Sequence, residues 1–380
     1  MNLTSTEEKP ISTALLGKSK EELDNFLGNE ENLALSERYL QDLKSPTFDF
    51  SQAKLTIANY NRIIQILDMF VKTFNLYLIK SDSAKKLRQE GLNLENEMND
   101  KRNNMELGAH YLSKDISKPP VFKPMSSVQL RSNLKASTSE EERKACYAGL
   151  RSIGPFAVSN GFVELVKLRN ACAKELGYED FYAYKLEQAE GFGKDVLFGM
   201  LDKLEADTRE VNIVARKRLA SESPLGDAAL EPHNVSYCVS GDVTAKLDPY
   251  FPFSKAIQRW GECYNEMNIK YKGAEMTLDL LDRKGKYSNG FCHWPKPAFI
   301  DENNKFHPTK TNFTSVASPS SVGSGLVAIT TLIHEAGHAA HFSNVEQYSQ
   351  LFSQERAPTS VAYAENQSMF LDSLCNDAEW

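Results

Sequence analysis

The 380-residue chain lacks the features that would place it among secreted, membrane or disulfide-rich proteins. Its six cysteines are scattered and form no C-x-x-C pair, which is typical of reduced thiols and argues against a disulfide framework or a cysteine-zinc site. No apolar run approaches the roughly 20 residues that a membrane span needs. The N-terminal segment is polar and acidic, unlike a secretory signal. These absences predict a soluble, cytoplasmic protein with no membrane partner.

The chain also has no excess of positive charge. It carries 44 Lys and Arg against 51 Asp and Glu, which gives a net charge of −7. Nucleic-acid-binding domains are usually basic, so this balance predicts no nucleic-acid partner. Hydrophobic residues make up 41% of the chain, enough for a substantial core, and the length predicts one large domain or two ordinary ones.

The first half of the sequence has mainly helical patterns. A capping box at 19–22 predicts a helix to about residue 43, and two more are expected from about residue 52 and over 83–111. The Pro119-Pro120 pair interrupts this pattern. We therefore expect an N-terminal helical lobe over 1–150 and a second domain over 151–380. Further helices are predicted from about residue 138 to 153 and over 157–175, 179–190 and 193–221.

Short strand-like runs follow from about residue 268. They lie at 268–271, 277–281, 290–294 and 311–316, and predict a small antiparallel sheet in a mainly α-helical fold. An edge strand of this sheet could pair with an extended peptide, although a sheet that only braces the next helix is equally compatible with the pattern. His293 is expected to be structural or at the surface, because nothing nearby has ligand spacing.

The segment after the sheet carries an H-E-x-x-H motif, with His334, Glu335 and His338. Histidines four residues apart share one face of a helix, where both can bind one zinc ion at about 2.0–2.1 Å. Glu335 would lie beside the ion and could accept a proton from a bound water. An ordinary buried helix is the alternative, but burying two unpartnered imidazoles and a carboxylate is costly. The motif therefore predicts a site for one zinc ion.

A catalytic zinc needs a third protein ligand and an open position. His341 lies on the same helix as the first two ligands, which is awkward for tetrahedral geometry, and Glu355 lies in a loop-like segment. Glu365 lies on a further predicted helix, at about 360–375, whose connection is long enough to bring it back to the site. We predict Glu365 as the third ligand and Asp372 as the carboxylate that holds a histidine N–H group.

These segments resemble the thimet oligopeptidase and oligoendopeptidase F family of zinc metallopeptidases. Two further segments also look familial, 176–186 (LGYEDFYAYKL) and 248–253 (DPYFPF), and the resemblance covers roughly 150–380. The family motif H-E-x-G-H-x-x-H and the family's third-ligand segment are matched by His334, Glu335, Gly337, His338 and His341, and by Glu365, Ser368 and Asp372.

The resemblance implies a zincin-like, mainly helical, clam-shaped enzyme with a substrate channel between two lobes. Its zinc would be held by His334, His338 and Glu365, and 151–380 would be the catalytic domain. Its substrates would be short unstructured oligopeptides, cleaved internally with Glu335 as the proton acceptor. Chains of the family continue beyond the third ligand, into a region with a histidine and tyrosines that stabilise the oxyanion. The sequence is therefore predicted to lack its C-terminal part and to have little peptidase activity by itself.

Other functions stay open at this point. A helical zinc carboxypeptidase also uses H-E-x-G-H on a helix. An aminopeptidase is less well supported, because the chain has no G-x-M-E-N segment. The alternative from a different class is a metal-binding but catalytically inactive fragment.

Overall fold

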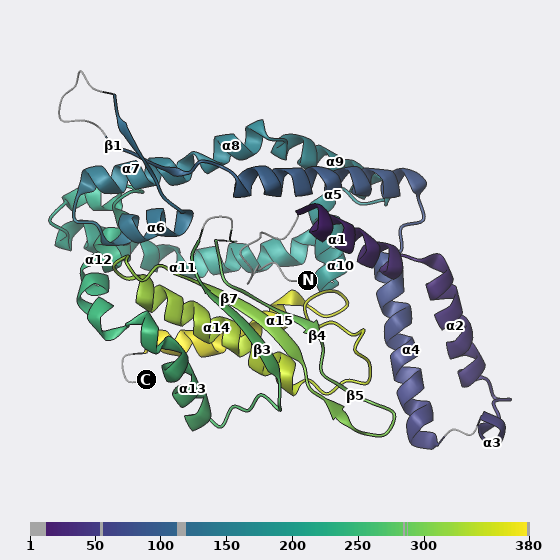
Figure 1. Ribbon diagram of the computed structural model, residues 1–380. Coiled ribbons are helices and arrows are strands. Elements are labelled where there is room, and N and C mark those ends of the chain that lie inside the picture. Colours follow the sequence, from purple (N-terminus) through teal and green to yellow (C-terminus); the bar gives the residue numbers. More distant parts are fainter. Residues whose placement is uncertain (1–12, 54–55, 112–118, 284–285, 287, 378–380) are drawn as a thin grey trace.

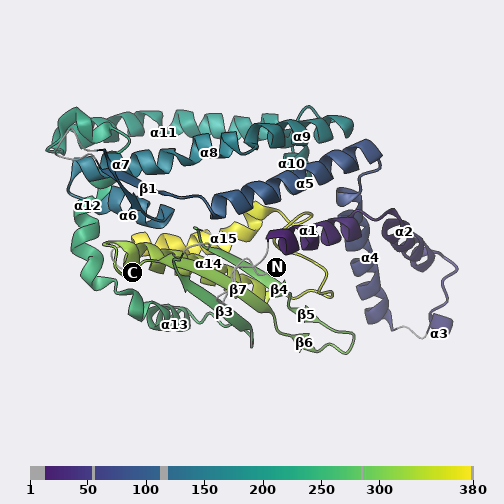
Figure 2. The same ribbon diagram turned by 45° about the horizontal axis from the view of Figure 1, so that its top comes forward.

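The computed structural model describes residues 13–53, 56–111, 119–283, 286 and 288–377. The protein consists mainly of helices with a small sheet; the penultimate α-helix lies against that sheet, and the last α-helix packs on the penultimate one (Figures 1 and 2). The α-helices are α1 (Thr13–Leu27), α2 (Glu30–Lys44), α3 (Phe50–Ala53), α4 (Ile57–Tyr77), α5 (Asp82–Asn103), α6 (Ser127–Ala136), α7 (Glu140–Arg151), α8 (Ile153–Ser159), α9 (Phe162–Glu175), α10 (Phe181–Glu190), α11 (Lys194–Glu222), α12 (Val235–Leu247), α13 (Ala256–Glu266), α14 (Ser324–Asn344) and α15 (Val361–Ser373). The strands are β1 (Gly108–Tyr111), β2 (Val121–Pro124), β3 (Glu275–Leu281), β4 (Phe291–Lys296), β5 (Phe299–Ile300), β6 (Phe306–His307) and β7 (Lys310–Ala317).

The mainly helical fold with a small sheet directly before α14 is confirmed, but several element boundaries differ from the prediction, and the run at 268–271 is not a strand. Ser19 lies inside α1 instead of capping it, and the predicted single helix to residue 43 is two helices. The break occurs at Asn29, whose side chain accepts the Asn32 N–H at 3.0 Å and so caps α2. Farther along, α5 ends at Asn103 and the chain continues into β1. The predicted division near residue 150 and the two-lobed channel stay predictions.

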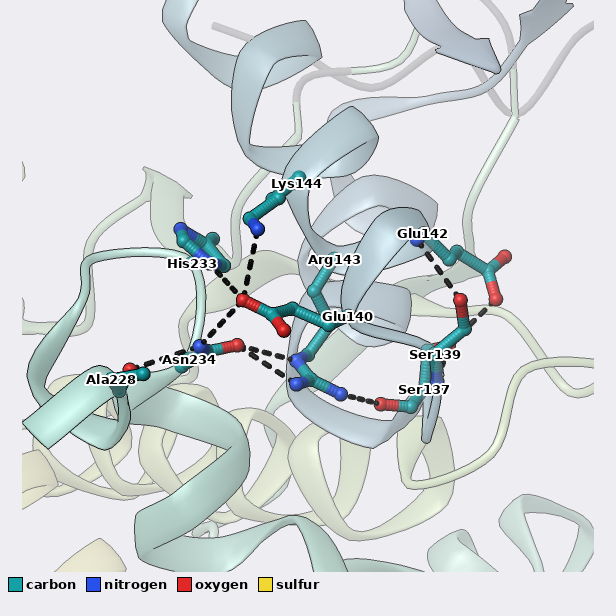
Figure 3. Close-up of polar contacts among 9 residues, drawn as sticks. All are labelled: Ser137, Ser139, Glu140, Glu142, Arg143, Lys144, Ala228, His233 and Asn234. Carbon is teal, nitrogen blue, oxygen red and sulfur yellow. Dashed lines mark hydrogen bonds and ion pairs between the residues drawn. The ribbon is translucent and has the colours of Figure 1, made fainter. Parts of the chain in front are cut away.

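A buried polar network joins α7 to the start of α12 (Figure 3). The Arg143 side chain is fully buried and donates from Nε and Nη2 to Asn234 Oδ1, at 3.0 and 2.8 Å. Its Nη1 donates to the Ser137 carbonyl at 2.8 Å. Asn234 in turn donates to Glu140 Oε1 and to the Ala228 carbonyl, at 3.3 and 2.9 Å. We call Glu140, Arg143, His233 and Asn234 the α7–α12 network.

The sheet before α14 has the strand order β3-β7-β4, and one of its pairings corrects the sequence prediction. β4 pairs antiparallel with β7, as expected, but β3 pairs parallel with β7, from Glu275 opposite Lys310. An alternating sequence pattern predicts a strand but not whether the neighbouring strand runs parallel or antiparallel to it. Here the chain passes from β3 through β4 and the β5–β6 hairpin before it returns as β7, parallel to β3. β7 is the central strand and is almost entirely buried, whereas β4 is an edge strand of this sheet.

Helix α14 is held firmly on the sheet by an apolar core and two tyrosines. Trp260 of α13 packs edge-on against Phe313 of β7, with ring centroids 5.6 Å apart. The hydroxyl of Tyr264 donates to the Ile333 carbonyl at 2.7 Å, and that of Tyr271 donates to the Ala336 carbonyl at 3.1 Å. The core and these bonds fix the middle of α14, where the histidine motif lies. Among the described residues, no helix is long and apolar enough to span a membrane.

Candidate metal centre

The two motif histidines lie on one face of α14, and α15 packs across that face. Gly337 permits this close approach. A Cβ atom at this position would lie 2.9 Å from the Ser368 Cα and 3.2 Å from a methyl group of Leu371. The glycine between Glu335 and His338 therefore has a packing role, because it lets α15 bring its carboxylates to the histidines.

Three potential ligands converge at this contact. The Nε2 atoms of His334 and His338 lie 3.3 and 3.2 Å from the same carboxylate oxygen, Glu365 Oε2. Ligand atoms at zinc distances in a tetrahedral arrangement are themselves about 3.3 Å apart, so the observed separations fit that ion. Within the described part of the chain, this is the one group of three His, Cys, Asp or Glu side chains whose ligand atoms all lie within 4.8 Å of one another.

Two neighbouring side chains of α15 orient these groups. His334 Nδ1 lies 2.8 Å from Asp372 Oδ2, so the N–H donates to the carboxylate and leaves the Nε2 lone pair directed at Glu365. Ser368 donates to Glu365 Oε2 at 3.1 Å. The structure therefore brings together His334, His338, Glu365 and Asp372, as the sequence predicted. The fifth predicted residue, Glu335, follows His334 on α14.

Glu335 is 5% exposed, and its Oε2 has no hydrogen-bond partner among the described residues. Gly290, just before β4, lies against the carboxylate, since a Cβ there would be 2.6 Å from Glu335 Oε1. Burial, with a smaller contribution from Glu365, raises the pKa of Glu335 to about 8. A cation held beside it would favour the ionised form and lower this pKa. Burial also lowers the pKa of His338, which favours the neutral imidazole that a metal requires.

A cavity of about 500 Å³ opens in front of these residues, and its lining includes side chains that were not predicted as part of the site. His293 Nδ1 lies 3.1 Å from Glu355 Oε1, and both side chains line the cavity. His293 thus lies on the cavity wall but outside the cluster of three ligands, and its expected structural or surface role stays a prediction. Burial alternates along β4, with Cys292 and Trp294 buried and Phe291 and His293 partly exposed, as period-two alternation in a strand predicts.

The remaining candidate ligands lie outside the cluster of three. His341 packs edge-on against Tyr363, with centroids 5.8 Å apart, and lies beside the cluster as predicted. Glu355 also lies outside it and pairs with His293 instead. The arrangement thus combines a possible metal site with a buried carboxylate, facing an open cavity.

The model of peptidase family M3 matches residues 133–380 of this chain. The chain belongs to peptidase family M3. This confirms the resemblance to the oligopeptidases, and the match includes all the candidate site residues of α14 and α15. No curated protein matches the chain significantly.

Among solved structures, the M3 chain is similar to a 3.1 Å X-ray structure provisionally described as an oligoendopeptidase F. The TM-score is 0.50 and the sequence identity is 16%, so this likeness concerns the fold. The alignment covers 94% of this chain and 57% of that one. The present chain therefore spans little more than half the length of that protein.

Proposed function

We propose that this chain is a zinc-dependent endopeptidase that hydrolyses short, unstructured peptides. The observation that carries the proposal is the buried, unpartnered carboxylate of Glu335 beside a cluster of ligands with zinc-like spacing. His334 Nε2, His338 Nε2 and a Glu365 oxygen would hold one zinc ion. When bound, zinc lowers the pKa of a coordinated water to about 7 and polarises the carbonyl group of the substrate.

The residues of the chain supply the proton transfers and the positioning. Glu335 accepts a proton from the attacking water at its free Oε2 and then donates it to the leaving amine. Asp372 keeps the proton of His334 on Nδ1, so that Nε2 stays available as a ligand. The buried setting of Glu335 limits competition from bulk water for that proton.

Strand β4 supports a peptide as the substrate. It is the edge of its sheet and lines the cavity through Phe291, Cys292 and His293. An extended peptide can pair with such an edge by backbone hydrogen bonds, which places its carbonyl groups along the cavity regardless of sequence. A folded domain cannot offer an extended segment of this kind, which favours unstructured substrates.

Metal analysis combined with peptide cleavage tests the proposal. We expect about one zinc ion per chain, and the peptide assay decides between the proposed activity and the little activity that the sequence predicts. The proposed activity requires cleavage of internally quenched peptides that a chelator stops, with internal fragments as products. Glu335→Gln should retain zinc and lose about 10²–10⁴-fold in kcat, the usual contribution of general acid–base catalysis. Release of single C-terminal residues would identify a carboxypeptidase instead. Zinc binding without turnover by the wild-type chain would identify a metal-binding, inactive fragment, and absence of zinc would overturn the metal site itself.

A further inference from the structure

A second cavity, of about 660 Å³, adjoins the metal cavity and has a different character. It lies between helices α1 and α4, the end of β4 and the connection 345–360 between α14 and α15. We call it the apolar cavity. Most of its wall is apolar, and the side chains that line it include Leu27, Phe70, Phe74, Trp294 and Phe352. Its volume lies within the range of about 300–1,000 Å³ that is usual for ligand pockets.

The two cavities adjoin each other at β4. His293 and Glu355 line both of them, so this pair marks the place where they meet. Gly290 lies against Glu335 at the metal end, and Trp294 belongs to the wall of the apolar cavity. The three residues from Gly290 to His293 span about 10 Å in extended backbone. A peptide paired with β4 would therefore reach the apolar cavity about three or four residues from the bond at the metal site.

The walls of the apolar cavity come from distant parts of the chain but are tied together. Phe70 of α4 packs edge-on against Phe352 of the 345–360 connection, with ring centroids 5.7 Å apart. Arg62, on the same helix, donates to the carbonyls of Ile300, Asp301 and Tyr348. These contacts shape the cavity before any ligand arrives, which lowers the cost of binding.

We infer that the apolar cavity is a specificity subsite for one bulky apolar side chain of the peptide, such as Leu, Phe or Met. The inference rests on the proposed peptidase function and adds a substrate preference to it. Complete burial of such a side chain, compared with a serine at the same position, corresponds to about a tenfold or larger difference in affinity. The preference falls at a position three or four residues from the cleaved bond.

Binding measurements test this subsite without requiring turnover. Fluorescently labelled, unstructured peptides that differ only by Leu or Ser at one position are titrated into zinc-loaded Glu335→Gln protein, and the substituted position is moved along the peptide. We expect Leu to lower Kd about tenfold at one position. Phe26→Ser, at the rim of the apolar cavity, should reduce that gain to about threefold or less. Leu351→Ser, in the opposite wall, is a second variant with the same expectation.

The control is Phe198→Ser on α11. Phe26 and Phe198 are similarly exposed, at 44% and 46%, but Phe198 does not line the apolar cavity. Equal affinities of Leu and Ser peptides at every position, no peptide binding at all, or equal effects of the rim and control variants would overturn the subsite. Selective binding without cleavage by the wild-type chain would support the subsite and overturn the proposed activity. Cleavage without selectivity would support the proposed activity and overturn the subsite.

Discussion

Two polar clusters are buried in this protein, and they differ in whether their hydrogen bonds are complete. In the α7–α12 network, Arg143 and Asn234 are fully buried and their side-chain donors and acceptors meet partners within the chain. In the candidate metal centre, Glu335 Oε2 and His338 Nδ1 are buried without a partner among the described residues. Both clusters contain buried polar groups. The candidate metal centre differs from the structural network because some of its buried hydrogen-bonding atoms have no partner.

The largest predicted effect is the loss of zinc affinity when a proposed zinc ligand is removed. Glu365→Ala should lower zinc affinity by more than the roughly 10–100-fold that loss of an outer partner usually costs. Glu355→Ala is the matched control, because this carboxylate lines the same cavity without joining the three ligands. Zinc titration with a competing chelator measures both. Equal losses in the two variants would contradict the assignment of Glu365.

Removing the centre of the α7–α12 network should instead affect stability alone. Arg143→Met leaves Asn234 Oδ1 without its two donors and should lower the free energy of unfolding by about 1–3 kcal/mol. Denaturant unfolding measures this change. Zinc affinity of the folded variant should equal that of the wild type, and a parallel loss of zinc would show that the two clusters are not independent.

A smaller effect on zinc is expected from Asp372→Asn. The change weakens the acceptor for His334 Nδ1–H without altering the ligands themselves. Zinc affinity should fall by about 10–100-fold, while stability of the metal-free protein changes little. If Asp372 were only a surface residue of α15, the variant would bind zinc like the wild type.

The packing of α15 on α14 can be tested at Gly337. Gly337→Ala introduces a Cβ 2.9 Å from the Ser368 Cα, so the overpacking offsets the usual helix gain of alanine and should cost about 1 kcal/mol net. A several-fold loss of zinc affinity should accompany it, because Glu365 moves with α15. Gly199 on α11 has nothing within 4 Å of its Cβ position, so Gly199→Ala should be neutral or stabilising. Similar behaviour of the two variants in thermal unfolding would refute the close contact.

The smallest effect concerns acid stability of the α7–α12 network. Hydrogen bonds from His233, Lys144 and Asn234 lower the pKa of Glu140 from 4.5 to about 2. The unfolded chain then binds more protons between these values, so the stabilisation is present above pH 4.5 and is lost as pH falls towards 2. Glu140→Gln should make the fall of Tm over this range shallower than in the wild type. An unchanged acid limb would show that these bonds contribute nothing.

The sequence predicted the parts of the site that depend on local spacing. The helical repeat places His334 and His338 on one face, and a long connection followed by a second helix made Glu365 and Asp372 suitable partners. Features that depend on tertiary packing were not predicted. The parallel pairing of β3 with β7, the His293–Glu355 contact and the apolar cavity each join segments far apart in the chain, and no local pattern encodes such neighbours.

The connection from α14 to α15 gives the proposed metal a second consequence. Glu365 lies beyond residues 345–360, and this same connection forms part of the wall of the apolar cavity. With ligands on both helices, the proposed ion would close this stretch of chain into a ring, as a disulfide closes a loop. Withdrawal of the metal would open the ring. Under the proposed function, loss of zinc should therefore weaken the selection of peptides at the apolar cavity as well as their cleavage.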